Sequence, residues 1–383
     1  MPAPLVPATS PRDARAAGGR RCAIAGAGLL GRLLAWQLAR AGHAVDVYDP
    51  LPDASTRGAA GWTAAGMLSP VAELECADDD VFALGLRSLQ LWPDLLAGLP
   101  QPVDLHRRGS LLLAHRGDEG AASRVIGLLA DKAPAGHAPQ ALSLPDLTAL
   151  EPDVRGPAHA WLLPHEGQID TVQAMAALAA GAEAAGARFH WGQAVTRAEP
   201  GELHTARGRV RADWVFDLRG TGARPQLPVR GVRGEILHLQ APGVALSRPL
   251  RLLHPRHRVY IVPRRDDRIL VGASEIESED RSPISLRTTV ELLAAAHSVI
   301  PALAEARVVH TETNLRPALP DNLPRLDCEP GLTRLNGLFR HGWLIAPALV
   351  ERALGASGTL DSALAPAAAP PHPLAPHLAA TAP

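Results

Sequence analysis

The fold is decided by residues 22–49, which read CAIAGAGLLGRLLAWQLARAGHAVDVYD. The apolar residues 22–25 are typical of a buried parallel strand, and the glycine pattern Gly26-Ala-Gly28-Leu29-Leu30-Gly31 follows at once. Residues 29–41 have an apolar helical pattern with no breaker, and residues 44–48 predict a second strand. This order of strand, turn, helix and strand predicts an α/β fold built on a parallel sheet covered by helices.

The glycine turn also has the spacing of a dinucleotide site. Gly26 would make the tight turn, Gly28 would let the backbone approach a diphosphate, and Gly31 would let the helix pack on the strand. The start of the helix supplies free N–H groups and a partial positive charge for the diphosphate. Asp49, about twenty residues beyond the glycines, is placed to accept a hydrogen bond from a ribose hydroxyl. Because an acid here disfavours a 2′-phosphate, the pattern indicates FAD or NAD rather than NADP.

Composition excludes several classes of function. A chain of 383 residues can hold two domains, and its formal charge of −1 gives no electrostatic case for nucleic acid or an anionic membrane. Lys132 is the only lysine, so a PLP Schiff base would have to form in a polar, proline-flanked loop. Three scattered cysteines without a CxxC motif fit a reducing compartment with neither a disulfide framework nor a zinc ribbon. Without a transmembrane run or a signal-peptide core, the protein is expected in the cytoplasm, and we expect no metal site.

A loop of small residues, Gly61-Trp62-Thr63-Ala64-Ala65-Gly66-Met67, follows the first unit. These residues would let the backbone lie against a flat ligand, and they would equally suit tight packing against a helix. A helix over 81–99 and strands over 103–114, with Gly109 at the turn, come next.

The pattern of the first unit returns far downstream. Asp170 and Gln173 have the spacing of a capping box at the start of an alanine-rich helix. Residues 203–218 predict a hairpin whose second arm ends in Gly220-Thr-Gly222. A helix-to-strand unit ending in Gly-x-Gly indicates that the first domain resumes after an insertion, so this domain is discontinuous in sequence.

Residues 228–317 predict a second domain, a mostly antiparallel sheet with a helix on one face, which would serve the substrate. The strands are expected over 232–239, 259–263, 269–273 and 308–315, and the helix over 285–298. A strand over 332–339 and a helix over 343–354 return the chain to the first domain. The expected boundaries are 20–98, 157–227 and 318–355 for the first domain, 99–156 and 228–317 for the second, and disordered tails over 1–19 and 356–383.

Taken in order, the motifs of this chain resemble those of the FAD-dependent D-amino-acid oxidase superfamily, most closely the glycine oxidases of thiamine biosynthesis. The resemblance runs from about residue 22 to 352, so it implies a Rossmann-like FAD-binding domain beside an α+β substrate domain. The segments that carry it are 26–31, 64–68, 232–235, 259–264, 271–275, 315–317 and 339–347.

The resemblance implies non-covalent FAD and a reaction in which a small amine gives up a hydride from its α-carbon to flavin N5. Oxygen would then take the electrons and give hydrogen peroxide, and no nucleic acid or membrane would take part. A homo-oligomer is left open. The residues implied for the cofactor are Gly26, Gly28, Leu29, Leu30, Gly31, Asp49, Gly61, Trp62, Ala65, Gly66, Met67, Val195, Leu338, Phe339, Arg340, His341, Gly342, Trp343 and Leu344.

Three residues are implied for the substrate. Arg316 matches the arginine that anchors the substrate carboxylate, Tyr260 matches a hydroxyl that binds the same carboxylate, and Arg340 matches an arginine near both substrate and flavin. Trp62 and Arg258 depart from the residues common in relatives, so either could change the pocket and the substrate preference.

Other classes remain open at this stage. A sarcosine-oxidase-like enzyme would hold its flavin through a cysteine near residues 314–316 and use a lysine, but Cys328 lies beyond that point and Lys132 is far from any flavin motif. A quinone-linked amino-acid dehydrogenase would need a docking surface for a membrane, and none is visible in the sequence. A non-catalytic flavoprotein would not need to retain both Tyr260 and Arg316.

Overall fold

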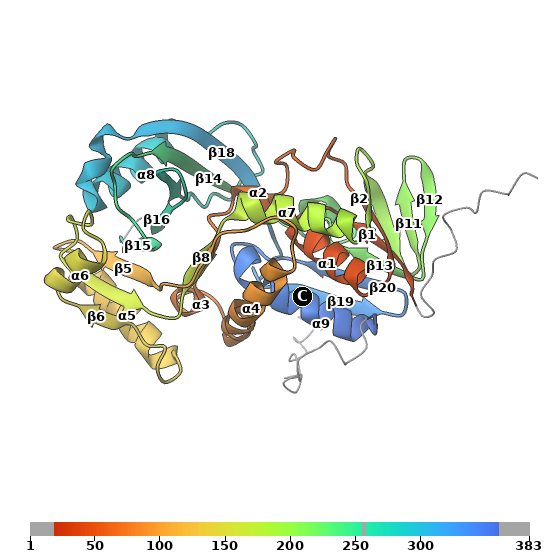
Figure 1. Cartoon of the computed structure of the whole chain (residues 1–383), viewed down its shortest axis with the longest axis horizontal. Coiled ribbons are helices and arrows are strands. Elements are labelled where there is room, and N and C mark those ends of the chain that lie inside the picture. The colour runs from red at the N-terminus through yellow and green to blue at the C-terminus, as the bar shows by residue number, and fades with distance from the viewer. Residues whose placement is uncertain (1–18, 255–257, 360–383) are drawn as a thin grey trace, which may run out of the picture.

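The computed structural model describes residues 19–254 and 258–359 and consists of two bodies that lie side by side (Figure 1). The first body contains a six-stranded sheet in the order β19-β20-β13-β1-β2-β9. Strand β1 lies at its centre, parallel to β2 on one side and to β13 on the other. The bounds are β1 Arg21–Ala25, β2 Ala44–Tyr48, β9 Arg188–His190, β13 Trp214–Asp217, β19 Arg325–Glu329 and β20 Leu332–Asn336.

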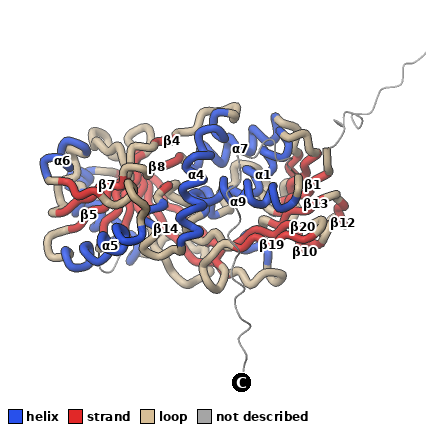
Figure 2. The backbone as a smooth tube through the Cα atoms, turned by 90° about the horizontal axis from the view of Figure 1, so that it is seen from below, coloured by secondary structure: helices blue, strands red, loops and turns tan. Residues whose placement is uncertain are grey.

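The helices of this body form where the apolar pattern predicts them. Helix α1, Leu29–Arg40, packs against α7, Thr171–Ala184, and against α9, Gly342–Ser357. Its apolar residues Leu33, Leu34 and Leu38 are fully buried in a core shared with these helices. The second body, with β5 (Ser110–Ala114), β7 (His159–Leu163), α5 (Glu119–Lys132) and α6 (Leu144–Leu150), lies at one end of the molecule, and the first body, with β1, β13, β20 and α1, lies at the other (Figure 2). The expected parallel sheet covered by helices, interrupted and then resumed, is therefore confirmed.

The second body contains an eight-stranded sheet in the order β18-β14-β17-β16-β15-β5-β7-β6. All its neighbouring strands are antiparallel except the pair β15 and β5, as a mostly antiparallel domain requires. Helix α8, Leu286–Val299, contacts this sheet at β16 and β17. The bounds are β5 Ser110–Ala114, β6 Gln140–Leu142, β7 His159–Leu163, β14 Arg230–Gln240, β15 Leu250–Leu253, β16 Arg258–Pro263, β17 Arg268–Gly272 and β18 Arg307–Ala318.

Two further sheets of three strands differ from the expectations. The hairpin predicted over 203–218 forms between β11 and β12, but its second arm ends at Arg211; β10 joins it on the side of β11, and β13 belongs to the large parallel sheet. Strands β4 and β5 are separated by Gly109 as predicted, yet β4 pairs with β8 and β5 with β7. The bounds are β3 Met67–Leu68, β4 Leu105–His106, β8 Gly167–Ile169, β10 Val195–Glu199, β11 Glu202–Thr205 and β12 Gly208–Arg211.

The boundaries expected from the sequence need two corrections. Strand β7 pairs with β5 and β6 in the second sheet, so the first domain does not resume at residue 157. Ala356 and Ser357 complete helix α9, and the other residues of the expected tails lie mainly outside the described ranges. The remaining elements are α2 Ala60–Thr63, α3 Pro70–Glu73, α4 Asp79–Ala97, α5 Glu119–Lys132, α6 Leu144–Leu150 and the 3₁₀ turns η1 Gly220–Ala223 and η2 Pro301–Glu305.

The capping box at the start of α7 is half formed. The Asp170 carboxylate accepts a hydrogen bond from the backbone N–H of Gln173, as predicted. The Gln173 side chain instead bonds Asp104. Its amide oxygen accepts from the backbone N–H of Asp104, and its amide nitrogen donates to the Asp104 carboxylate. In the described part of the chain, helices of the length and apolarity needed to cross a membrane are absent.

Candidate active site

A cavity of about 1210 Å³ is lined by both bodies. One end is formed by the glycine turn, the loop after β2 and the residues that follow β13. The other end is formed by β14, β16, β18 and the segment after β17, and the start of α9 lies between them. Segments more than 300 positions apart in the sequence therefore share one chamber, and we call its two parts the nucleotide end and the substrate end.

The geometry of the first turn agrees with the roles predicted for Gly26 and Gly31, and the diphosphate contact of Gly28 stays a prediction. Gly26 has φ +100°, a left-handed conformation that glycine adopts without strain. A Cβ on Gly31 would stand 1.9 Å from the carbonyl oxygen of Gly26, so the helix can approach the turn only without a side chain. A Cβ on Gly28 would meet only Ala59, at 3.7 Å, so the space beside this residue belongs to the cavity.

Asp49 lines the nucleotide end and shapes it. Its carboxylate accepts hydrogen bonds from the backbone N–H groups of Ala27 at 2.7 Å and Leu51 at 2.9 Å. The acid thus ties the end of β2 to the glycine turn. Its predicted bond to a ribose hydroxyl stays a prediction.

Trp62 does not line the cavity, unlike its neighbours Gly61 and Thr63. It is buried against Arg32, whose guanidinium lies 5.1 Å from the Trp62 ring centre and 5.6 Å from that of Trp191. Arg32 is itself fully buried, and burial lowers its pKa to about 10. The backbone carbonyls that it reaches are those of Ala27 at 2.8 Å, Ala54 at 2.9 Å and Met175 at 2.9 Å. Arg32 therefore joins the glycine turn, the loop after β2 and helix α7.

The start of α9 forms the middle of the cavity wall. Gly342, its first residue, has no neighbouring atom within 4 Å of a would-be Cβ, and the helix lacks a side-chain cap. Its first N–H groups are therefore available to a ligand. The Trp343 indole donates to the carbonyl oxygen of Gly61 at 2.9 Å, which holds this helix against the small-residue loop.

Tyr260 and Arg316 lie together at the substrate end, and two glycines make room for them. A Cβ on Gly272 would stand 2.6 Å from the Tyr260 ring, and one on Gly234 would stand 2.6 Å from the Arg316 guanidinium carbon. Burial raises the pKa of the Tyr260 phenol, while the charge of Arg316 beside it acts in the opposite direction. Arg316 donates to the carbonyls of Ser274 at 3.0 Å and Arg233 at 3.3 Å. Among the described residues, no carboxylate forms an ion pair with it.

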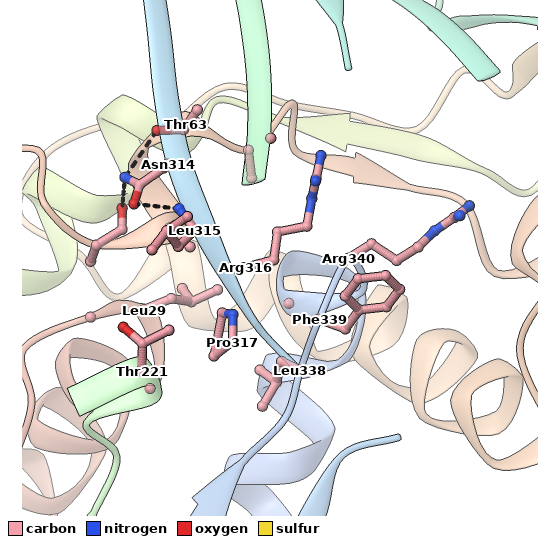
Figure 3. Close-up of a pocket in the computed structure, with 18 of the residues that line it drawn as sticks. Leu29, Thr63, Thr221, Asn314, Leu315, Arg316, Pro317, Leu338, Phe339 and Arg340 are labelled. Atoms are coloured by element: carbon pink, nitrogen blue, oxygen red, sulfur yellow. Dashed lines mark hydrogen bonds between the residues drawn. The ribbon is translucent and has the colours of Figure 1, made fainter. Parts of the chain in front are cut away.

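Arg340 lies at the same end, but its guanidinium is already ion-paired with a carboxylate of the chain, that of Glu73. Its Nε and Nη2 lie 3.1 and 3.2 Å from the two oxygens of Glu73, and Glu73 also accepts from Arg251 at 2.8 Å. His341 Nδ1 is 3.2 Å from the same carboxylate, and Glu275 approaches Arg340 Nη1 at 3.7 Å. Although burial opposes ionisation, the charges of Arg340 and Arg251 hold the pKa of Glu73 well below its usual range. In Figure 3 the side chains of Arg316 and Arg340 extend to the same side of the pocket, away from Leu29.

Sequence reasoning missed Glu73 and Arg251, and it missed the group that holds the Glu73 turn in place. Glu166 is completely buried and accepts hydrogen bonds from the backbone N–H of Ala72 at 2.9 Å and from the hydroxyl of Ser110. Burial raises the pKa of Glu166 to about 7. The position of Glu73, five residues after the end of the Gly66-Met67-Leu68 motif, was the one signal that could have indicated it.

The structure brings together nearly all the residues expected at the site. Of the cofactor residues, only Gly31 and Trp62 do not line the cavity, and each supports a segment that does. Those that line it are Gly26, Gly28, Leu29, Leu30, Asp49, Gly61, Ala65, Gly66, Met67, Val195, Leu338, Phe339, Arg340, His341, Gly342, Trp343 and Leu344, with Tyr260 and Arg316 at the substrate end. The side chain of Arg258 lies outside the described residues.

These features fit FAD. Two helices begin at the cavity without side-chain caps, and the open space at Gly28 and Gly342 lets a ligand approach both backbones. The cysteine and lysine of the sarcosine-oxidase-like alternative do not line the cavity: Cys328 is an exposed residue of β19, and Lys132 bonds the carbonyl of Leu74 from the end of α5.

A model of the FAD dependent oxidoreductase family, DAO, matches residues 21–352, and the chain therefore belongs to this family. A Rhizobium etli protein named as a thiamine biosynthesis oxidoreductase, ThiO, is 41% identical over 331 residues, which cover 86% of this chain and 94% of that protein. The crystal structure of glycine oxidase from Geobacillus kaustophilus has a TM-score of 0.79 at 26% identity, and the match covers 90% of this chain and 96% of that one. For iminodiacetate oxidase from Chelativorans sp. the TM-score is 0.77 at 27% identity, with 88% and 95% covered.

Proposed function

We propose that this protein oxidises glycine or a small D-amino acid to the corresponding imine and that the imine serves thiazole formation in thiamine biosynthesis. The observation that carries the proposal is Arg316, a guanidinium at the cavity wall with the Tyr260 hydroxyl beside it and no carboxylate of the described chain bound to it. A planar guanidinium binds one carboxylate through two parallel hydrogen bonds. The names of the relatives, ThiO and glycine oxidase, support the same reaction.

The chain's own residues bind and orient the substrate. Arg316 and Tyr260 would hold the carboxylate, which fixes the direction of the α-carbon and its hydrogens. When bound, FAD supplies a two-electron acceptor for the hydride of that carbon, and oxygen would receive the electrons and yield hydrogen peroxide.

No side-chain base is assigned to the reaction. Glu73 is ionised and buried, but two arginines share its carboxylate, which lowers its basicity. A substrate amine that binds in its neutral form would need no base, because its lone pair can assist departure of the hydride directly.

Peroxide release by the FAD-loaded protein with glycine, sarcosine and D-alanine tests this function. Arg316→Ala should lower kcat/KM by at least about 30-fold, because a buried charge-assisted pair is worth roughly 2–5 kcal/mol. The FAD content should not change. Arg209→Ala, at an exposed arginine of β12, is the matched control and should behave as the unmodified protein. An unchanged KM in Arg316→Ala would exclude the anchor role.

A further inference from the structure

The substrate end holds more arginine than one carboxylate needs. Arg251 and Arg340 both reach the Glu73 carboxylate, Arg316 lines the same cavity, and the charges of all three act on the Tyr260 phenol. Glycine, sarcosine and D-alanine each have one carboxylate, and Arg316 with Tyr260 suffices to bind it. The other two arginines would suit a second carboxylate if their donors were free.

Their donors are not free. The Glu73 carboxylate accepts from Arg251 Nη2 at 2.8 Å, and Arg340 directs both Nε and Nη2 to it at 3.1 and 3.2 Å. Arg251 Nη1 is bound to the carbonyl of Ala72 at 3.0 Å, and Arg340 Nη1 is directed toward Glu275 at 3.7 Å. The Glu73 side chain is 13% exposed, so these pairs are protected from water and screened little by salt.

The charges at this end match one carboxylate. Among the described side chains here, Arg251, Arg316 and Arg340 against Glu73 and Glu275 leave one positive charge, which a single substrate carboxylate neutralises. Farther along the lining, Glu291 pairs with Arg287 at 3.0 Å and Glu277 with Arg230 at 3.0 Å, and Arg281 lies 3.3 Å from the side-chain oxygen of Asn314. A second carboxylate placed beside Arg251 and Arg340 would therefore approach Glu73 and Glu275, and such like-charge contacts oppose binding.

We propose that Glu73 is a specificity-determining residue that restricts the site to amines with a single carboxylate, by occupying Arg251 and Arg340. The inference rests on the proposed function and narrows its substrate class. It follows that removal of the Glu73 charge, with the side-chain shape kept, frees two guanidiniums for an amine dicarboxylate.

The test compares sarcosine with iminodiacetate, which is sarcosine with a carboxylate added to its N-methyl group. In Glu73→Gln, the ratio of kcat/KM for iminodiacetate to that for sarcosine should rise roughly 10- to 100-fold, as expected for a gained charge-assisted hydrogen bond. Glu73→Asp keeps the charge and is the matched control, in which the ratio should stay low. A ratio that does not rise in Glu73→Gln overturns the proposal.

A binding measurement keeps the proposal testable if Glu73→Gln does not fold. Acetate and malonate are titrated into the FAD-loaded, unmodified protein, and the flavin absorbance spectrum reports binding. We expect malonate to bind no more tightly than acetate, and malonate binding tenfold tighter or more would overturn the proposal. The titration does not depend on turnover. If the protein oxidises none of the amines, the proposed function is refuted, and the titration still decides the role of Glu73.

Discussion

Replacement of Arg32 by methionine should destabilise the protein by about 2–6 kcal/mol and weaken FAD binding. Arg32 donates to the carbonyls of Ala27, Ala54 and Met175, and hydrogen bonds from a charged donor are worth about 1.5–3 kcal/mol each, or about 5–9 kcal/mol together. Burial lowers the pKa of Arg32 to about 10, and relief of that burial returns about 3 kcal/mol at about 1.4 kcal/mol per pKa unit. Methionine can still pack between the two indoles, so the carbonyls account for the net loss.

Urea unfolding of FAD-free and FAD-loaded protein, followed by tryptophan fluorescence, measures the stability, and titration with FAD measures the affinity. The affinity should fall because Ala27 and Ala54 belong to the glycine turn and to the loop that leads into the cavity wall. Arg32→Lys keeps the charge but cannot reach three carbonyls, and it should lie between the other two proteins. Equal stability of Arg32→Met and the unmodified protein would refute the reasoning. It would mean that the three hydrogen bonds only offset the cost of burying the charge, as happens where buried charged groups are replaced by apolar side chains without loss.

Three further outcomes are expected. Gly234→Ala should raise KM for glycine while FAD stays bound, because the added Cβ would stand 2.6 Å from the Arg316 guanidinium carbon and displace it. Steady-state kinetics measures KM and flavin absorbance measures the FAD content, and an unchanged KM would contradict the prediction. Gly28→Val should weaken FAD binding, measured by fluorescence titration, while the unfolding of FAD-free protein changes little, because the added atoms would occupy cavity space. The pKa of Glu166 is raised by burial from 4.5 to about 7, so the folded protein binds more protons than the unfolded chain between these values and loses up to about 3 kcal/mol as pH rises across them. Glu166→Gln should remove this contribution to the loss of stability, which thermal unfolding at pH 5 and pH 8 measures. A variant that loses as much stability between the two pH values as the unmodified protein would contradict the prediction.

The nucleotide end could be predicted from the sequence because its pattern is local. The strand, the glycine turn, helix α1 and strand β2 occupy residues 21–48, and each element is specified by its own apolar period and by glycines at fixed spacing. Strand β15 was missed for the opposite reason. Its four residues, Leu-Arg-Leu-Leu, do not alternate, and they form a strand because β16 and β5 lie on either side.

The substrate end could be predicted only where a motif marks it. Glu73 is one acid among many, and its role depends on Arg251 and Arg340, which are 178 and 267 positions away in the sequence. Trp62 was expected against the cofactor because it lies in the small-residue loop, but the loop turns it toward Arg32. A buried arginine inside an apolar helix has no local signal that separates it from an exposed one.

Helix α9 is the last described element along the chain, and its first turn lines the same cavity as the glycine turn, which precedes it by more than 300 residues. During translation the early strands and helices can emerge and begin to fold, since domains fold as units while synthesis proceeds. Their pocket nevertheless lacks one wall until residues 338–344 leave the ribosome. Uptake of the flavin must therefore wait until the start of α9 has been made, so a ribosome-bound fragment that ends before α9 should remain colourless.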